Sequence, residues 1–445
     1  MSYASPPPSQ GYIESILDTD LYKLTMQRAV LETFPQVKVK YRFTNRGKQR
    51  FTKKVHEAVL KAVVNLSKLS LTKPERGWLE KRCPYFPASY LDYLEKFRFN
   101  PSKQVEINWV VEGKNEEGED VGNFEIEIDG LWCETILYEV PLMSIISEAY
   151  FTEQEQSWDY VGQFENARSK GKDLFTSGCI VSEFGSRRRR TQLAHDVIMR
   201  GLISADKEYG SGAGPSGAGG KLAGTSNVHF AQKYDLNPVG TIAHEWIMGI
   251  AAFEGYDHCN GRAMDAWEKI YPDGSLGIAL TDTFTTKPFF EDYISDPERA
   301  NRWRGLRQDS GDPLVFLQAA KEVFLKVGAD PKKKVIVFSD ALDVEKCITL
   351  KKASDEAGVG CSFGVGTQFT NDFKRVDGPV KQDTPGEGSI RSEGETSKAL
   401  NMVIKLYKIQ DEFCVKISDE LTKNTGNPES VKKIKEQFGL ETSDS

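Results

Sequence analysis

Apolar and polar residues alternate along the first third of the chain. In VKVKYRF (37–43) apolar and basic residues occupy opposite faces, and VEINWV (105–110) and NFEIEI (123–128) repeat the pattern. Period-two alternation is typical of strands with one buried and one solvated face, as in an antiparallel sheet. These strands predict an N-terminal domain of antiparallel sheet and helices over residues 12–165.

From about residue 170 the apolar runs no longer alternate. Each run is short and ends in polar or glycine residues, and helical patterns such as PLVFLQAAKEVFLKVGA (313–329) lie between several of them. Apolar strands that alternate with helices indicate a parallel sheet covered on both faces. Seven such units predict a closed or nearly closed α/β barrel over residues 166–377, with its chemistry at the carboxyl ends of the strands. The seven runs are GCIVSEFG (178–185), LAGTSNVHF (222–230), VGTIAHEW (239–246), LGIALTDTF (276–284), RGLRQDSGD (304–312), KKVIVFSDA (333–341) and GCSFGVGTQFT (360–370).

Other segments extend these two domains. DTDLYKLTMQRAVLETF (18–34) predicts a helix with Asp18 or Thr19 as its N-cap. Residues 376–399 are polar and rich in turn formers, so we expect them to lead out of the barrel. The C-terminal segment, residues 398–440, contains LNMVIKLYKI, a predicted strand that rejoins the N-terminal sheet, and then a charged helix.

The glycine-rich stretch YGSGAGPSGAGGKLAG (209–224) does not satisfy the pattern of a nucleotide-binding P-loop. Lys221 is followed by Leu222, so the hydroxyl that would hold Mg²⁺ is missing. We predict a flexible surface insertion there. The start of the chain, MSYASPPPSQGY, lacks the basic and hydrophobic regions of a secretory signal and predicts a short disordered lead-in.

Composition narrows the functional classes. The 445 residues are 39% hydrophobic and 28% charged with a net charge of -7, which predicts a globular protein without broad binding to nucleic acid or anionic membranes. No apolar run approaches the roughly 20 residues that a membrane span needs. The seven cysteines are dispersed without a C-x-x-C pair, which favours free thiols in a reducing compartment. The predicted location is the cytoplasm, with the nucleus as a second compartment.

His244, one of five histidines, lies within the mostly apolar stretch GTIAHEWIMG. A core histidine bonded to a backbone carbonyl is one interpretation. The other is a nucleophile or proton carrier presented at the end of a buried strand.

Two motifs suggest a site for phosphate. In FGVGTQFT, Gly364 and Gly366 follow a strand and let backbone N–H groups approach an anion, and Thr367 adds a hydroxyl. In SEFGSRRRR, Arg187 follows a predicted strand end and can grip phosphate, while the other arginines are expected at the surface or in salt bridges. Phe184 is either a core residue or one wall for a flat ring.

Aspartates follow several of the predicted strands. Arg307 and Asp309 lie in LRQDSGDP, and Asp282 and Asp340 follow two other strands. They suit ribose hydroxyls or a Mg²⁺-bound polyphosphate, although Asp340 fits a helix N-cap equally well. Neither a Ser/His/Asp order nor a metal-ligand spacing of His or Cys is evident. The set favours a phosphorylated sugar over acyl transfer, and no Schiff-base lysine or glutamate base indicates an aldolase or isomerase.

Nine motifs together resemble the nicotinate phosphoribosyltransferase family in its fungal form. The resemblance extends from about residue 12 to about residue 440. It implies an antiparallel N-terminal domain on an incomplete α/β barrel. It also implies that nicotinate and phosphoribosyl pyrophosphate react to give nicotinate mononucleotide and pyrophosphate, with coupled hydrolysis of ATP in the presence of Mg²⁺, as the first step of NAD salvage from nicotinate. The motifs are SILDTDLYKLTMQRAV, KYRFTNR, ETILYEVPLMSIISEAYF, SEFGSRRRR, GTSN, GTIAHEWIMG, ALTDTF, LRQDSGDP and FGVGTQFTNDF.

The resemblance assigns roles to the pyridine-binding residues. Phe184 and Tyr22 match the aromatic pair that sandwiches the ring, and in related enzymes the tyrosine comes from a second subunit, which implies a homodimer. Arg307 matches the arginine that approaches the pyridine carboxylate. Ser226 in GTSN, beside the substrate-binding Thr225, occupies the position of an aspartate in relatives that use nicotinamide. Because a carboxylate there would repel nicotinate, serine favours the acid as substrate over the amide.

The remaining roles concern phosphate and catalysis. His244 matches the histidine that ATP phosphorylates, and Glu245 is a candidate for orienting its imidazole. The resemblance further implies that Arg187 binds phosphate, that Asp309 binds ribose and that Asp282 lies near the Mg²⁺–pyrophosphate. It also implies that Asp340 binds substrate. The implied 5′-phosphate loop consists of Gly364, Gly366 and Thr367. No Mg²⁺ ligand is assigned.

Overall fold

The computed structural model describes residues 12–211, 219–272, 274–376, 395–420 and 423–440. Its larger half is built on an open sheet of six parallel strands in the order β6-β5-β10-β9-β8-β7. The chain therefore contains the parallel sheet of the predicted incomplete barrel. The strands are β5 (Ile180–Glu183), β6 (Lys221–Thr225), β7 (Ile278–Leu280), β8 (Gly305–Gln308), β9 (Val335–Phe338) and β10 (Gly360–Val365).

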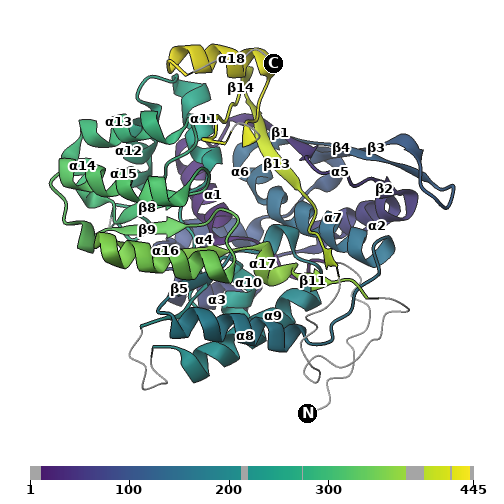
Figure 1. Ribbon diagram of the computed structural model, residues 1–445. Coiled ribbons are helices and arrows are strands. Elements are labelled where there is room, and N and C mark those ends of the chain that lie inside the picture. Colours follow the sequence, from purple (N-terminus) through teal and green to yellow (C-terminus); the bar gives the residue numbers. More distant parts are fainter. Residues whose placement is uncertain (1–11, 212–218, 273, 377–394, 421–422, 441–445) are drawn as a thin grey trace.

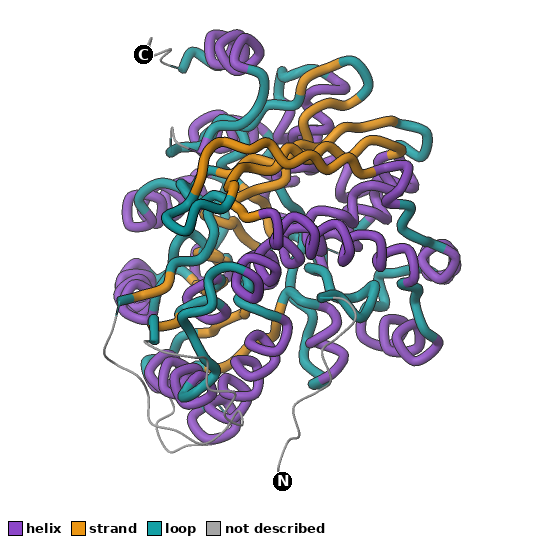
Figure 2. Tube along the Cα trace, turned by 90° about the vertical axis from the view of Figure 1, so that its right-hand side faces the viewer, coloured by secondary structure: helices purple, strands orange, loops and turns teal. Residues whose placement is uncertain are grey.

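Helices connect these strands because parallel neighbours need crossover connections. In the view of Figure 1, α12 to α15 lie above β8 and β9, α16 lies below these strands, and α8 and α9 lie lower still. Figure 2 shows the longer antiparallel strands of the second sheet in the upper part of the molecule. The helices are α8 (Gln163–Thr176), α9 (Gln192–Tyr209), α10 (Val228–Lys233), α11 (His244–Glu254), α12 (Cys259–Ile270), α13 (Thr286–Ser295), α14 (Pro297–Arg302), α15 (Pro313–Lys326), α16 (Val344–Ala357) and α17 (Thr367–Thr370).

One of the seven predicted strands is wrong. Residues 239–243 form no strand, and His244 is the first residue of the buried helix α11. The apolar run does not stop at 246 but continues into the helix, and periodicity cannot distinguish a short buried strand from a buried helix. Gly240, at φ 152°, turns the chain where a Cβ would lie 3.2 Å from the backbone nitrogen of Tyr22.

The second sheet is antiparallel and has the order β14-β13-β1-β4-β2, with β3 paired to β4. Along β1 the buried residues are Val39, Tyr41 and Phe43, as the alternation predicts. The C-terminal strand β13 pairs with β1, so the prediction that this segment rejoins the N-terminal sheet is confirmed (Figure 1). The strands are β1 (Lys38–Asn45), β2 (Phe51–Thr52), β3 (Val105–Lys114), β4 (Asp120–Leu131), β13 (Met402–Ile409) and β14 (Glu412–Phe413); β11 (Phe373–Lys374) and β12 (Thr396–Ser397) form a separate pair.

The helix predicted after residue 18 is α1 (Leu21–Thr33), but its N-cap is Asp20 rather than Asp18 or Thr19. Asp18 instead forms a bidentate ion pair with Arg189, in which each carboxylate oxygen lies 2.8 Å from a guanidinium nitrogen. The other helices of this half are α2 (Lys53–Asn65), α3 (Lys73–Arg82), α4 (Ala88–Lys96), α5 (Pro101–Gln104), α6 (Trp132–Thr135), α7 (Glu139–Glu153) and the C-terminal α18 (Pro428–Gln437).

Among the described residues, no helix combines the length and apolar character that a bilayer crossing requires. The predicted disordered lead-in, much of the glycine-rich insertion and most of the segment 376–399 lie outside the described residues. The predicted domain boundaries stay predictions.

Candidate active site

A cavity of about 260 Å³ opens at the carboxyl ends of the parallel strands. Loops after β5, β6, β8, β9 and β10 line one side of it, and residues of the antiparallel sheet and the C-terminal segment line the other. Most of the site residues predicted from the sequence meet here, at the end of the sheet that the parallel topology indicated. Those that line it are Tyr22, Phe184, Arg187, Ser226, His244, Arg307, Asp309, Asp340, Gly364, Gly366 and Thr367.

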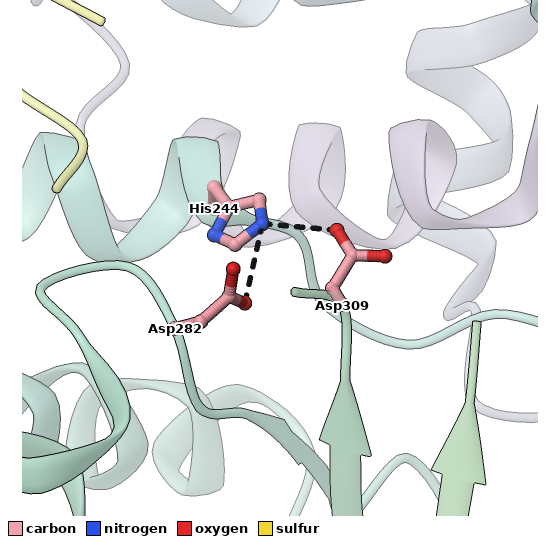
Figure 3. Close-up of side chains that lie close together, drawn as sticks. All are labelled: His244, Asp282 and Asp309. Carbon is pink, nitrogen blue, oxygen red and sulfur yellow. Dashed lines mark hydrogen bonds and ion pairs between the residues drawn. The ribbon is translucent and has the colours of Figure 1, made fainter. Parts of the chain in front are cut away.

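The imidazole of His244 is held from both sides. Its Nδ1 lies 3.0 Å from the hydroxyl of Thr283, and its Nε2 lies 3.2 Å from a carboxylate oxygen of Asp309 (Figure 3). Burial, and after it the ammonium of Lys416, lower the pKa of His244 to about 4, against the opposing effect of Asp282 and Asp309. The imidazole is therefore neutral at pH 7, which is the nucleophilic form.

Glu245 does not orient His244, contrary to the prediction from adjacency. Its carboxylate accepts hydrogen bonds from the hydroxyl of Tyr41 and the indole of Trp132, and it forms an ion pair with Lys23. Successive residues in the first turn of a helix point in different directions, so adjacency in sequence does not bring the two side chains together.

Asp282 is buried behind the imidazole and does not line the cavity. Its Oδ2 accepts hydrogen bonds from Ser310 at 2.6 Å and Lys416 at 2.9 Å. Its Oδ1 lies 3.6 Å from His244 Nε2 and accepts no hydrogen bond from any residue that the structure describes. Burial would raise the pKa of Asp282, but His244 and Lys416 lower it.

His244, Asp282 and Asp309 offer ligand atoms that all lie within 4.8 Å of one another, close enough to hold a metal ion. Figure 3 shows both carboxylates directed at the imidazole. The three residues lie far apart in sequence, so no His or Cys spacing could have revealed them.

Arg307 and Asp309 form one unit at the end of β8. The guanidinium donates to Asp309 at 3.0 Å and to Ser339 at 2.8 Å, and Ser339 in turn donates to Asp309 at 2.8 Å. Arg307 also lies 5.7 Å from the ring centroid of Phe184. A flat, anionic ligand beside Phe184 would therefore meet this guanidinium.

The four consecutive arginines divide between the cavity wall and the protein interior. Arg187 and Arg188 line the cavity, whereas Arg189 and Arg190 are fully buried. The expected salt bridge exists for Arg189, but Arg190 is stacked on the ring of Phe151, with 3.8 Å between the guanidinium carbon and the ring centroid. The expectation of a surface position is wrong for Arg190, because the loop after β5 runs between helices rather than over them.

A carboxylate lies beside Ser226. The Ser226 hydroxyl donates to Asp20 at 2.8 Å, and Asp20 lines the cavity 3.9 Å from Arg187. Burial raises the pKa of Asp20, an effect that Arg187 opposes. The serine therefore does not by itself remove negative charge from this wall, and Arg187 must offset it.

The predicted phosphate loop lies against the predicted ring slot. A Cβ on Gly364 would lie 2.3 Å from the ring of Phe184, so only glycine allows β10 to pass this ring. Gly366 precedes the single turn of α17, whose first residue is Thr367.

Thr225 does not reach the cavity. It is fully buried, and its hydroxyl donates to Glu183 at 2.6 Å.

Asp340 does line the cavity and pairs with Lys423 at 2.6 Å, while the N-cap of the following helix is Asp343. The N-cap interpretation of Asp340 is therefore wrong.

Tyr22 lines the cavity of its own chain, so this cavity receives its tyrosine without a second subunit. The homodimer stays a prediction.

Sequence reasoning missed five cations on the cavity wall, and the polar face of the strand at 402–409 was the available signal for one of them, Lys405. The five are Arg46, Arg188, Lys405, Lys416 and Lys423.

Comparison with known proteins gives consistent results. Models of the nicotinate phosphoribosyltransferase family and its N-terminal domain match residues 179–442 and 17–147. The chain is 40% identical over 437 residues to nicotinate phosphoribosyltransferase of Saccharomyces cerevisiae, covering 97% of this chain and 96% of that one. It is 41% identical over 438 residues to the Methanosarcina mazei enzyme of the same name, covering 94% and 97%. A crystal structure of the S. cerevisiae protein superposes with a TM-score of 0.87 at 39% identity, covering 97% of this chain and 100% of that one. A crystal structure of nicotinate phosphoribosyltransferase from Porphyromonas gingivalis superposes with a TM-score of 0.81 at 34% identity, covering 96% of this chain and 100% of that one.

Proposed function

The chain belongs to the nicotinate phosphoribosyltransferase family, and from that premise we propose that it converts nicotinate and phosphoribosyl pyrophosphate to nicotinate mononucleotide and pyrophosphate. In this reaction the pyridine nitrogen attacks the anomeric carbon, a C–N bond forms, and the C–O bond to pyrophosphate breaks. ATP hydrolysis is coupled to the transfer through phosphorylation of His244. The product enters NAD synthesis, so the enzyme salvages nicotinate.

The observation that carries this proposal is a neutral, buried imidazole on the wall of a cavity rich in cations. Arg46, Arg188, Lys405, Lys416 and Lys423 surround a space of about 260 Å³. Such a wall suits a ligand with several phosphates, because each phosphate needs charge-assisted donors. It occurs on a chain whose net charge is -7, so the cations are concentrated at this place.

Phosphoryl transfer to His244 requires a free lone pair on the attacking nitrogen. If the ring proton lies on Nδ1, the Thr283 oxygen at 3.0 Å accepts it and Nε2 keeps its lone pair. The Asp309 carboxylate, 3.2 Å from Nε2, must then turn away from the ring before Nε2 attacks the γ-phosphorus. An N–P bond then forms, the bond from phosphorus to the bridging oxygen breaks, and ADP leaves. Water later attacks the phosphorus, inorganic phosphate leaves, and the imidazole is restored.

The residues around His244 fit a Mg²⁺ ion. Asp282 Oδ1 is a buried carboxylate oxygen without a hydrogen bond from the described residues, and the more exposed Asp309 faces the cavity. Mg²⁺ is commonly held by one or two carboxylates together with substrate phosphates. When bound, the ion would neutralise charge on the phosphates. Lys416 and Arg307, which contact Asp282 and Asp309, keep these carboxylates ionised.

The ring slot supports nicotinate as the substrate. Tyr22 and Phe184 line the same cavity, and Arg307 lies beside Phe184 to receive the substrate carboxylate. Arg187, which the resemblance assigns to phosphate, lies beside Asp20 on the Ser226 side, so we assign it to this carboxylate as well. The neutral amide gains less from two guanidinium groups, so the acid is favoured despite Asp20.

The test is a direct comparison of nicotinate and nicotinamide with phosphoribosyl pyrophosphate, ATP and Mg²⁺. We expect nicotinate mononucleotide to form and kcat/KM for nicotinate to exceed that for nicotinamide by at least about 100-fold, which corresponds to about 2.7 kcal/mol. Equal use of the two substrates would refute the choice of substrate, and no mononucleotide from either would refute the proposed reaction.

A further inference from the structure

Lys23 is a fully buried lysine that has no part in the chemistry described above. It follows Tyr22 on α1, and its side chain is 0% exposed. A buried ammonium is costly unless it is paired and fully hydrogen-bonded, and an apolar residue of similar volume is often as stabilising. Its partners therefore indicate what it does.

The ammonium joins two carboxylates from different helices. Its Nζ lies 2.6 Å from Glu139 at the start of α7 and 2.5 Å from Glu245 in the first turn of α11. The second oxygen of Glu245 is fixed by Tyr41 and Trp132, as described above. Burial would lower the pKa of Lys23, but the two glutamates raise it, so the ammonium keeps its charge.

Each carboxylate leads to a different part of the active site. Glu139 accepts a hydrogen bond from Arg187 at 3.3 Å, and Arg187 lines the main cavity. Glu245 is bonded through the backbone to His244. A smaller cavity of about 40 Å³ lies at this junction and is lined by both glutamates, Arg187 and His244.

We infer that Lys23 is a positioning residue that fixes Tyr22, Arg187 and the amino-terminal end of α11 relative to one another. This inference rests on the proposed function, because it concerns the residues that hold the ring and receive phosphate. Lys23 touches neither substrate nor the reacting atoms. It acts through Glu139 on the ring side and through Glu245 on the histidine side.

The decisive variant is Lys23→Met, which keeps an unbranched side chain of similar volume and removes the charge. We expect KM for nicotinate to rise at least tenfold, because Arg187 and Tyr22 lose their fixed positions. We also expect the rate of His244 labelling by γ-labelled ATP, measured without nicotinate, to fall at least fivefold.

Lys334→Met is the matched control. Lys334 is also a buried lysine, but it lies before β9 at the opposite end of the parallel sheet, and its ammonium donates to the carbonyls of Ala300, Asn301 and Trp303. Its loss should lower thermal stability without changing KM or the labelling rate of the folded protein. If Lys23→Met behaves like this control, Lys23 is only structural and the inference is overturned.

A second variant tests whether the effect of Lys23→Met comes from the lost position of its partners or from the changed net charge of the cluster. Lys23, Arg187, Glu139 and Glu245 sum to zero charge, and Lys23→Met combined with Glu245→Gln again sums to zero. We expect this double variant to fold even if Lys23→Met does not, and still to show the raised KM and slower labelling. Full recovery of both would overturn the inference. If the wild type neither labels nor forms mononucleotide, the proposed function fails instead.

Discussion

At the scale of single residues, Ser226 and Asp20 illustrate how a neighbour changes the meaning of a motif. The motif alone predicts that serine removes a carboxylate, yet Asp20 accepts a hydrogen bond from the serine hydroxyl at 2.8 Å. Asp20 is tolerated because the guanidinium of Arg187 lies 3.9 Å away. Arg187 also pairs with Glu139, so an aspartate at position 226 would be a third carboxylate beside this cation.

Ser226→Asp tests this balance. The added carboxylate should repel nicotinate and accept the amide of nicotinamide, so KM for nicotinate should rise at least about tenfold, or about 1.4 kcal/mol, while use of nicotinamide improves. Steady-state kinetics with both substrates measure the change. An unchanged ratio of the two kcat/KM values would show that Ser226 does not face the ring substituent.

Lys405 gives a prediction of pH dependence. Its pKa is lowered to about 8, chiefly by burial; Glu139 and Asp309 oppose this effect, and the charges of Arg187 and Lys416 add to it. The charged form, which attracts phosphate, exists below pH 8 and is lost as the pH rises through 8. We expect kcat/KM for phosphoribosyl pyrophosphate to fall by about tenfold per pH unit above that value.

Lys405→Met should remove this alkaline limb and lower kcat/KM at pH 7. A pH profile measured from 6 to 10 for both proteins provides the check. If the limb persists unchanged in the variant, another group titrates there.

At the scale of elements, the strands were more predictable than the loops between them. Alternation identified β1, β3 and β4, and apolar runs identified the six strands of the parallel sheet, because each pattern follows from which faces are buried. The run at 239–246 was misassigned because a helix buried on all sides has no apolar stripe to reveal its period. His244, the first residue of this helix, nonetheless lies where the carboxyl ends of the strands meet.

The contact between β10 and the loop after β5 can be tested with Gly364→Ala. The added Cβ would lie 2.3 Å from the ring of Phe184, so the ring must move. We expect KM for nicotinate to rise at least fivefold, with little change in His244 labelling, since the imidazole lies elsewhere in the cavity. Gly77→Ala in α3 is a control for the loss of a glycine, because a Cβ there meets nothing within 4 Å and the helical backbone accepts alanine. Equal KM values for the two variants would contradict the close packing.

At the scale of the whole molecule, the cavity lies between two sheets, and this was the least predictable feature. The ends of the parallel strands predicted the residues on one side of the cavity. Lys405 and Lys416, on the other side, come from a segment far along the chain. The pattern of a strand shows which residues avoid the core, but not which cavity they face. The pairing of β13 with β1 brings Lys405 to the site, and the bridge between Ile417 and Phe284 brings Lys416 there.

The same architecture predicts that each chain carries a complete site. Tyr22 and His244 line one cavity of one chain, so mixing inactive Tyr22→Ala and His244→Ala proteins, with unfolding and refolding together, should restore no activity. Activity approaching one quarter of the wild-type value would show that Tyr22 is supplied by a partner subunit. The controls are each variant refolded alone and wild type treated in the same way.

The most direct test of the account is incorporation of phosphate from γ-labelled ATP into His244. The account predicts an acid-labile label, stable to alkali, that appears in the wild-type protein and is absent from His244→Ala. Thr283→Val should label more slowly, because Nδ1 loses the hydroxyl at 3.0 Å. Undiminished labelling of His244→Ala would place the nucleophile elsewhere and contradict the central claim.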